Sequence, residues 1–363
     1  MKVGVFSNDF YPFIGGIGKH ILDLLYNNEY LNKMIFSPSD RNNLPNHIKI
    51  DFILHKILKN ISLSFFFNIF INKLQRCYNL DVINIHCGPG GLFLLKKSNC
   101  LIVATCHHTF WQQSHYIKSQ WWKRIFIPFE KKTYQLADKI IAVSEDSKDI
   151  LIKKYKIKLE KITVIPNGVE ANKFFPITNI EKIPNSMLYI GRVDKRKGVD
   201  FLIKSMLRVV KSNPNSKLFI GGKGKDLNKL KKFVIKNKLE NNINFLGFIS
   251  DDKINEWYNK VQCVIVPSIF EGFGITVIES MAAGTLVIGT NVDGIRTIIK
   301  NKINGYLVDY GNVGSLSETI NYVLHNNCLD IIKNASKDIE EKYNIDIVRK
   351  VTGEFYNNLD ISE

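Results

Sequence analysis

The stretch Ser268–Gly284, SIFEGFGITVIESMAAG, joins a predicted strand to a predicted helix through a glycine-rich turn. It follows VQCVIVP, a run of apolar and β-branched residues that is typical of a buried parallel strand. Glu271 comes directly after that strand, and ITVIESMAAG predicts a buried helix that carries a second carboxylate, Glu279. A strand, a turn and a helix in this order form the repeating unit of a doubly wound α/β sheet.

The same alternation runs through the whole chain. Short β-branched runs such as KVGVFS, DVINIH and CLIVATC alternate with longer segments of helical period. The pattern breaks at IPNGVEANKFFP, where proline and glycine mark a boundary, and restarts with SMLYIGR and SKLFIGG. We predict an α/β protein with two doubly wound, Rossmann-like domains, residues 1–168 and 169–344, that face each other across a cleft. Ligands of such sheets bind outside the carboxyl ends of the strands, so we expect the site in that cleft.

The composition limits the partners and the compartment. The 363 residues have a formal net charge of +16, which favours nucleic acid, an acidic membrane or a phosphorylated small molecule, although lysine abundant throughout the chain explains it equally well. Six cysteines lack paired spacing, so we infer a reducing compartment. The opening MKVGVFSNDF is too short for a signal segment, and no stretch reaches the roughly 20 apolar residues of a membrane span. We expect a cytoplasmic protein, in solution or at the inner face of the membrane.

The two glutamates suit a ligand with sugar hydroxyls. A carboxylate accepts hydrogen bonds from two hydroxyls at once, as a ribose diol or adjacent sugar hydroxyls offer. Glu271 lies just past a strand end, and the Cβ of Glu279 tilts toward the N-terminus of its helix, where amides can donate to a phosphate. The pair therefore fits a ligand with sugars on both sides of a diphosphate. The alternative for Glu279 is a surface glutamate near a positive helix end, which fits an apolar helix less well.

A basic loop suits the diphosphate itself. The segment YIGRVDKRKGVDFL places Arg192 and Lys197 between a predicted strand and a predicted helix, where two cations can neutralise a diphosphate. The alternative is a solvated run of charges, because Lys195 and Arg196 stand between them.

A glycine-rich loop opens the first predicted helix. In PFIGGIGKHI, Gly15, Gly16 and Gly18 let backbone amides approach a phosphate, although a plain turn explains them as well. The loop lacks the third glycine of a dinucleotide-binding fingerprint and lies too far past the first strand for its tight turn, so that motif is excluded.

Three histidines follow predicted strands of the first domain. The segment VATCHHTFWQQ contains His107 and His108, and INIHCGPGG contains His86. A histidine there can donate to a substrate hydroxyl or carbonyl. Metal binding is the alternative, but no cysteine or carboxylate stands at ligand spacing and no Asp-x-Asp pair occurs in the chain. We therefore predict no metal site.

Together these motifs resemble the retaining glycosyltransferases of family 4, which have the two-domain GT-B fold. The matching segments run in order over nearly the whole chain: YPFIGGIGKHI, VATCHH, VIPNGVE, YIGRVDKRKGVDFL, INFLGFISDDKINEWY, VPSIFEGFGITVIESMAAGTLVIGT and NGYLV. The resemblance implies a nucleotide-sugar donor bound mainly by the second domain, an acceptor bound by the first, and no metal or other cofactor. It also implies that a closing helix within residues 345–363 returns to the first domain.

The resemblance gives each matching residue a role. By position, Glu271 contacts the donor sugar and His107 lies beside its reacting carbon, and these two are the expected catalytic residues. His108 remains an alternative to His107, because an extra histidine occupies what is usually a single position. The expected donor-binding residues are Gly16, Arg192 and Lys197 at the diphosphate, Glu279 at the ribose, and Gly272, Phe273 and Gly274 in the turn.

The implied activity is transfer of a sugar, expected to be a hexose, from a nucleotide-diphosphate sugar to a glycan, lipid-linked or small-molecule acceptor, with retention at the anomeric carbon. The leaving phosphate oxygen would take the acceptor proton, so no protein base is required. Two positions depart from the family pattern: Thr285 replaces a usual proline, and Arg296-Thr297 replaces proline or alanine followed by glutamate. The second lies beside the expected nucleotide, so the donor base and sugar are not predicted.

Three alternatives concern partners and class. The basic aromatic segment YIKSQWWKRIFIPFEKK, residues 116–132, suits an anionic bilayer that presents a lipid-linked acceptor, but we favour tryptophans packed into the domain. A sugar-nucleotide epimerase of the same architecture is the alternative function, although it is not expected to carry the glutamate pair. We expect no nucleic-acid partner, because carboxylates in a phosphate-facing cleft repel a polyanion.

Overall fold

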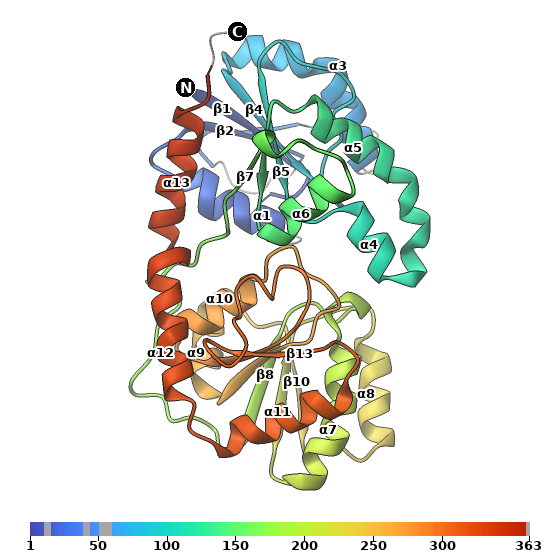
Figure 1. Ribbon diagram of the computed structural model, residues 1–363, viewed down its shortest axis with the longest axis vertical. Coiled ribbons are helices and arrows are strands. Elements are labelled where there is room, and N and C mark those ends of the chain that lie inside the picture. Colours follow the sequence, from blue (N-terminus) through green and yellow to red (C-terminus); the bar gives the residue numbers. More distant parts are fainter. Residues whose placement is uncertain (11–15, 39–43, 51–59, 361–363) are drawn as a thin grey trace. The chain divides into compact units, whose positions relative to one another are not determined.

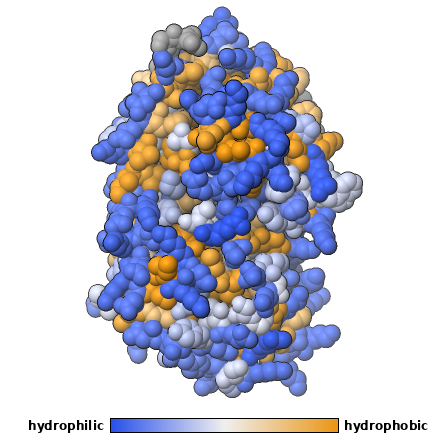
Figure 2. All heavy atoms as spheres, viewed as in Figure 1, coloured by the Kyte–Doolittle hydropathy of each residue, from blue (hydrophilic) through white to orange (hydrophobic). Residues whose placement is uncertain are grey.

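The computed structural model describes residues 1–10, 16–38, 44–50 and 60–360. The chain divides into two compact units, Met1–Gly168 with Ile345–Glu363 (unit 1) and Val169–Asn344 (unit 2). Each unit contains one parallel sheet covered by helices (Figure 1). This arrangement confirms the predicted α/β class with two doubly wound sheets. Figure 2 shows polar side chains spread over the face in view, with apolar side chains interspersed among them.

Unit 1 contains a seven-stranded sheet in the order β3-β2-β1-β4-β5-β6-β7. At its centre, Val5 of β1 pairs with Ile35 of β2 on one side and with Asn84 of β4 on the other. The strand order reverses between β1 and β4, and ligands of open parallel sheets bind beyond the carboxyl ends of the strands at such a reversal. The strands are β1 (Lys2–Phe6), β2 (Asn32–Ser37), β3 (His47–Lys49), β4 (Val82–Cys87), β5 (Leu101–Cys106), β6 (Lys139–Ala142) and β7 (Ile162–Val164).

Two local features define the helices that follow β5. At the start of α4, the Thr109 hydroxyl accepts from the Gln112 N–H, and the Gln112 side chain accepts from the Thr109 N–H at 2.8 Å, which is a capping box. Proline in the first turn of α5 needs no hydrogen bond to its nitrogen. The helical segments of unit 1 are α1 (Gly16–His20), η1 (Ile21–Tyr26), α3 (Asn60–Tyr78), α4 (Phe110–Tyr116), η2 (Lys118–Phe126), α5 (Ile127–Leu136), α6 (Glu145–Lys153), η3 (Leu159–Lys161) and α13 (Ile345–Asn357).

The tryptophans of residues 116–132 do not pack into the domain, so that expectation was wrong. Trp121 and Trp122 are 66% and 51% exposed. They lie on η2, a run of 3-10 turns with non-helical backbone at Gln120 and no buried residue. Phe126, also on η2, packs against Phe93 and Phe110, whereas the two tryptophans remain exposed. We call the exposed apolar side chains here the aromatic patch, and its members are Trp121, Trp122, Ile125 and Phe129.

Helix α13 belongs to unit 1 although unit 2 precedes it in the chain. It lies beside η1 (Figure 1), where Asn28 donates to the Arg349 carbonyl at 2.9 Å and Arg349 donates to the Asp23 carbonyl at 2.8 Å. Tyr356 is fully buried, and its hydroxyl accepts from the side chain of Asn84 on β4. The last helix therefore completes the core of the first unit.

Unit 2 contains a six-stranded parallel sheet in the order β10-β9-β8-β11-β12-β13. The order reverses between β8 and β11, so the loops that follow these two strands lie at the switch point. The strands are β8 (Ser186–Ile190), β9 (Lys217–Gly221), β10 (Ile243–Gly247), β11 (Cys263–Val266), β12 (Leu286–Thr290) and β13 (Tyr306–Val308). The helical segments are η4 (Lys195–Lys197), α7 (Val199–Ser212), α8 (Leu227–Lys236), α9 (Asp251–Lys260), α10 (Ile275–Ala282), α11 (Val313–His325), α12 (Leu329–Asp338) and η5 (Ile339–Tyr343).

Candidate active site

The loop between β11 and α10 holds Glu271 in a fixed place. The Glu271 N–H donates to the Asp293 carbonyl at 3.1 Å, and the Thr290 hydroxyl donates to the Ser268 carbonyl at 2.6 Å. Gly274 caps α10 with φ of 111°, a conformation that favours glycine. Of the two glycines in this turn, Gly274 has positive φ and Gly272 does not. One left-handed residue at the start of the helix is enough to make the turn.

The loop between β8 and α7 meets the Glu271 loop through a glycine. Gly198 has φ of 66°, and a Cβ built on it would lie 1.8 Å from the carbonyl oxygen of Pro267. The Ile269 N–H also donates to the Arg196 carbonyl at 2.8 Å. The two loops at the switch point of unit 2 are thus in backbone contact. This contact places Arg196 and Lys197 of one loop beside the Glu271 carboxylate of the other.

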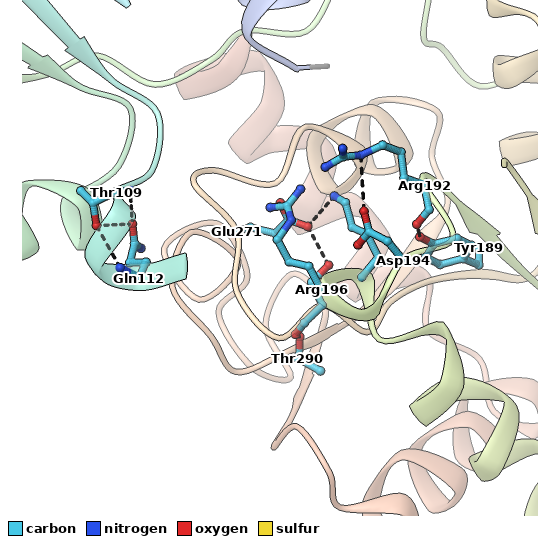
Figure 3. Close-up of polar contacts among 10 residues, drawn as sticks. Thr109, Gln112, Tyr189, Arg192, Asp194, Arg196, Glu271 and Thr290 are labelled. Carbon is cyan, nitrogen blue, oxygen red and sulfur yellow. Dashed lines mark hydrogen bonds and ion pairs between the residues drawn. The ribbon is translucent and has the colours of Figure 1, made fainter. Parts of the chain in front are cut away.

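Glu271 is enclosed by donors from both loops (Figure 3). Its Oε1 accepts from Lys197 Nζ at 2.6 Å and from the Ser268 hydroxyl at 2.6 Å, and its Oε2 accepts from Arg196 at 3.2 Å. The residue is 7% exposed. Arg196 also lies over the ring of Phe270, 5.4 Å from its centroid. A carboxylate beside two cations is ionised, and its donors hold it in one orientation.

The pKa values of this cluster agree with that description. Burial raises the pKa of the Glu271 carboxyl, but Lys197 and Arg196 outweigh it and bring the pKa down to about 2. Burial lowers the pKa of the Lys197 ammonium, and the Glu271 charge opposes that change. At neutral pH the cluster therefore contains an anion beside two cations.

Arg192 lies at the exposed edge of the same loop (Figure 3). Its side chain is 58% exposed, and its Nε lies 3.7 Å from Asp194. The Tyr189 hydroxyl on β8 donates to the Arg192 carbonyl at 2.7 Å and fixes the backbone there. In this loop Arg192, Lys195, Arg196 and Lys197 outnumber the carboxylates of Asp194 and Glu271, so the charge at this edge is positive.

Glu279 lies on α10 and is buried. The hydroxyl of Tyr258, from α9, donates to Glu279 Oε2 at 2.9 Å. A buried carboxylate needs a hydrogen-bond partner, and Tyr258 supplies one. The Tyr258 bond fixes the orientation of the carboxylate.

Unit 1 brings three histidines together beyond its strands. His107 follows β5, His86 lies on the neighbouring β4, and His20 ends α1. His86 Nδ1 and His107 Nε2 are 2.8 Å apart, while His20 Nδ1 lies 2.6 Å from Asn167 Oδ1. All three are buried, whereas His108 is half-buried. Burial lowers the pKa of His20 to about 4 and those of His86 and His107 well below the usual value, so all three rings are neutral at pH 7.

These histidines form a candidate metal-binding group, which sequence spacing did not predict. One ring nitrogen from each of His20, His86 and His107 lies within 4.8 Å of the others. Among the described residues this is the one group of histidines, cysteines and carboxylates close enough to hold an ion. His86 and His107 hydrogen-bond to each other.

A buried glutamate fixes the segment that carries His107. Glu130, on α5, accepts from the Phe110 N–H at 3.0 Å, and therefore holds the first turn of the helix that follows His107 and His108. The hydroxyls of Tyr155 and Tyr134 also donate to it. Burial raises the pKa of Glu130 to about 8, although these donors act in the opposite direction.

Of the N-terminal glycines, Gly15 lies outside the described residues. Gly16 is exposed and is the first residue of α1. The Gly18 N–H donates to Asp9 Oδ2 at 3.2 Å. The first turn of α1 thus already has a carboxylate at its amides, and the role of Gly16 stays a prediction.

Four residues with contacts in the candidate site were not singled out from the sequence: Arg196, Ser268, His20 and Tyr258. Arg196 entered the sequence analysis only in the alternative of a solvated run of charges, yet its side chain is 13% exposed and paired with Glu271. Its only sequence signal was adjacency to Lys197 in a loop ahead of a helix. Ser268 lies three residues before Glu271, a spacing that allows a hydroxyl to reach a carboxylate across a turn. His20 and Tyr258 gave no signal, because their partners are far away in the chain.

Comparisons with known proteins agree with this geometry. The profile of Glycosyl transferases group 1 matches residues 170–338, and that of Glycosyltransferase Family 4 matches residues 14–173. An uncharacterized glycosyltransferase of Methanocaldococcus jannaschii is 30% identical over 352 residues, covering 90% of this chain and 89% of that protein. The alpha-monoglucosyldiacylglycerol synthase of Acholeplasma laidlawii is 25% identical over 339 residues, covering 84% of each. Another uncharacterized glycosyltransferase of M. jannaschii is 30% identical over 231 residues, and that match spans 59% of its length.

Solved structures support the fold. WaaG, a glycosyltransferase involved in lipopolysaccharide biosynthesis, aligns with a TM-score of 0.79 at 17% identity, over 98% of this chain and 100% of that chain. Sucrose-phosphate synthase from Thermosynechococcus elongatus aligns with a TM-score of 0.77 at 18% identity, over 98% of each. Both are GT-B proteins. The profile matches to both halves and the near full-length relative show that this chain belongs to glycosyltransferase family 4 and is a glycosyltransferase of GT-B fold.

Proposed function

We propose that this glycosyltransferase takes a hexose from a nucleotide-diphosphate sugar and transfers it, with retention at the anomeric carbon and without a metal or other cofactor, to a glycan, lipid-linked or small-molecule acceptor. The observation that carries the proposal is Glu271, ionised and held between Lys197 and Arg196 at the switch point of unit 2. A fixed anion there can accept from hydroxyls of the donor sugar, and the adjacent cations can meet the charge of a diphosphate.

The loop after β8 supplies the charge that the departing diphosphate needs. Lys197 uses one donor on Glu271 at 2.6 Å, and an ammonium has three donors, so it can bind Glu271 and a phosphate oxygen together. The exposed guanidinium of Arg192 can fork onto the same phosphates. With the leaving oxygen so stabilised, it can take the acceptor proton on the face from which it departs. Glu279 would bind the ribose, and His107 would contact the donor sugar.

One relative and one surface support a lipid-linked acceptor. The A. laidlawii relative is by name a synthase of alpha-monoglucosyldiacylglycerol, a glycolipid. In this chain, the four residues of the aromatic patch are 46% to 66% exposed. Lys118, Arg124 and Lys132 are exposed in the same segment, and its one carboxylate, Glu130, is buried. Apolar side chains among cations suit the boundary of an anionic bilayer, and we propose that unit 1 rests there.

Transfer assays test the activity. The protein is incubated with labelled UDP, GDP and ADP hexoses, with and without diacylglycerol and glycan acceptors, and the product linkage is determined by NMR. The expected result is a product with the anomeric configuration of the donor, formed in the presence of EDTA. An isomerised donor without transfer would instead identify an epimerase, and an inverted product would rule out retention.

Vesicle binding tests the membrane surface. The variant Trp121→Ser/Trp122→Ser should lose most of its cosedimentation with phosphatidylglycerol vesicles, while wild type binds them more than phosphatidylcholine vesicles. Ile235→Ser is the matched control, because Ile235 is 61% exposed on a lysine-rich helix of unit 2. Among the described residues no helix is long and apolar enough to cross a bilayer. Equal binding by both variants would show that net charge alone, not the aromatic patch, attracts the protein.

A further inference from the structure

The protons of the three buried histidines can be placed from their partners. The Asn167 oxygen only accepts, so His20 Nδ1, 2.6 Å away, must carry a proton and donate it. Asn167 is itself buried, 5% exposed, just beyond β7.

His86 offers the decisive observation. Its Nε2 is buried, and no group in the part of the chain that the structure describes lies within hydrogen-bond reach of it. A buried N–H without a partner is rarer and more costly than a buried acceptor without one. The proton of this neutral ring therefore lies on Nδ1, and it points at His107 Nε2, 2.8 Å away.

The tautomer of His107 follows. Because His107 Nε2 accepts from His86, the remaining proton of the neutral His107 ring must lie on Nδ1. The His20 ring stands edge-on to both others, at 70° to His86 and 90° to His107, and packs against this near-coplanar, hydrogen-bonded pair. His86, on β4, therefore sets the position of the His107 proton, and His86 and His20 together set the orientation of the His107 ring.

We propose that His86, supported by His20 and Asn167, is a positioning residue that gives His107 one tautomer, with Nδ1–H as its sole donor toward the substrate. The proposal rests on the proposed function, in which His107 contacts the donor sugar. An N–H donor held in one orientation stabilises a developing negative charge or a sugar hydroxyl better than a ring that exchanges tautomers. Glu130 supports the same segment independently by holding the Phe110 N–H.

Two variants of His86 separate positioning from mere packing. The amide nitrogen of asparagine lies two bonds from Cβ, as His Nδ1 does, so His86→Asn can still donate to His107. The amide of glutamine lies one bond further out, near the place of Nε2, so His86→Gln keeps polarity and size but not the bond. We expect kcat to fall by roughly 10- to 100-fold in His86→Gln, with little change in donor KM, and to stay within about 3-fold of wild type in His86→Asn. Equal losses in both variants would overturn the proposal.

A spectroscopic measurement tests the tautomers without relying on activity. In protein labelled with 15N-histidine, long-range 1H–15N spectra distinguish Nδ1–H from Nε2–H rings, and His20→Asn, His86→Asn and His107→Asn assign the signals. We expect Nδ1–H for all three rings, and loss of the single tautomer at His107 in His86→Gln. An Nε2–H signal from wild-type His107 would overturn the proposal. The expected tautomers together with full transfer by His107→Asn would instead disprove the role of His107 in the proposed function.

Zinc titration of the same proteins tests whether His86 and His107 share a proton or the three histidines bind a metal ion. Zn²⁺ is titrated into wild type and into both His86 variants, with His325→Gln as the control for an exposed histidine. We expect no stoichiometric binding that depends on His86. Tight one-to-one binding lost equally in His86→Asn and His86→Gln would show that the three rings form a metal site, and would overturn the positioning role.

Discussion

Glu271 is surrounded by donors before any ligand has bound. Lys197, Arg196 and Ser268 together donate to both of its oxygens, and its loop is fixed by Thr290 and by the Asp293 carbonyl. A carboxylate prepared in this way need not reorganise when a sugar arrives, which is the condition for effective electrostatic catalysis. The same enclosure makes the residue important for folding, because a buried ion pair that loses one partner leaves uncompensated charge.

Replacing Glu271 by glutamine should therefore reduce both activity and stability. We expect transfer to fall by roughly 100-fold or more, as for loss of a preorganised charge. The free energy of unfolding should fall by about 3 kcal/mol, because Lys197 and Arg196 lose their anion. Steady-state kinetics and urea unfolding measure the two effects. Glu256→Gln is the control, since Glu256 pairs with Lys253 and Lys260 on the surface of α9. Unchanged transfer by Glu271→Gln would disprove the assigned role.

Acid should remove the contribution of Glu271 to stability. The folded-state pKa of about 2 lies below the ordinary value of 4.5, so between these pH values the unfolded chain binds a proton that the folded protein does not. The stabilisation is complete above pH 4.5 and is lost as the pH falls toward 2. The difference in unfolding free energy between wild type and Glu271→Gln, measured by urea titration from pH 7 to 3, should therefore shrink below pH 4.5. A difference that stays constant over this range would contradict the description.

At the scale of elements, the candidate site forms where the loop after β8 contacts the loop after β11. Sequence patterns predicted both strands, both following helices, and the loop positions of Glu271 and Lys197. They did not predict that Arg196 is paired rather than solvated, since that depends on the reversal of strand order that places β8 beside β11. The histidine cluster shows the same limit, because His20, His86 and His107 meet only through the order of β1, β4 and β5. Local periodicity contains no information on such pairings.

Gly198 tests whether the contact between loops matters. Gly198→Ala should destabilise the protein and weaken binding of a nucleoside diphosphate, because the added Cβ would lie 1.8 Å from the Pro267 carbonyl oxygen. Gly247→Ala is the matched control: its φ of 71° is close to the 66° of Gly198, but nothing lies within 4 Å of the added carbon. We expect the control to lose only about 1 kcal/mol of stability and to keep its affinity in calorimetric titration with UDP, GDP and ADP. Equal effects of the two substitutions would mean that backbone strain alone is responsible.

Glu130 should make unit 1 less stable as the pH rises. Its folded-state pKa of about 8 lies above the ordinary 4.5, so the folded protein binds the extra proton between these values. Its contribution is complete below pH 4.5 and declines as the pH rises to 8, by at most about 1.4 kcal/mol per pH unit. In Glu130→Gln this dependence should disappear, which thermal unfolding of the two proteins at pH 5, 6, 7 and 8 would show. Parallel curves would mean that Glu130 is ionised in the fold.

At the scale of the whole molecule, each unit has its own sheet and its own buried core. The proposed contacts to the diphosphate come mainly from unit 2, whereas the histidines belong to unit 1. Binding energy from the nucleotide should therefore stabilise one unit first.

Hydrogen exchange can measure that difference. With saturating UDP, GDP or ADP, whichever raises the melting temperature most, protection should increase in residues 189–198 and 268–279. Added protection at residues 107–112 is expected only with the intact nucleotide sugar, because the sugar is the part proposed to meet His107. Exposed loops of unit 2 such as residues 326–328 serve as an internal control. Uniform protection over both units by the nucleoside diphosphate alone would contradict this assignment of roles.

The return of α13 to unit 1 has a consequence for biosynthesis. The ribosome makes residues 1–168 first, but Tyr356, which accepts from Asn84 in the middle of that sheet, emerges only after all of unit 2. During synthesis, unit 2 can therefore be completed while unit 1 still lacks helix α13 beside η1. Messages truncated ahead of the codons for α13 would yield proteins with the Glu271 loop intact and an exposed apolar surface in unit 1, a form that chaperones and proteases recognise.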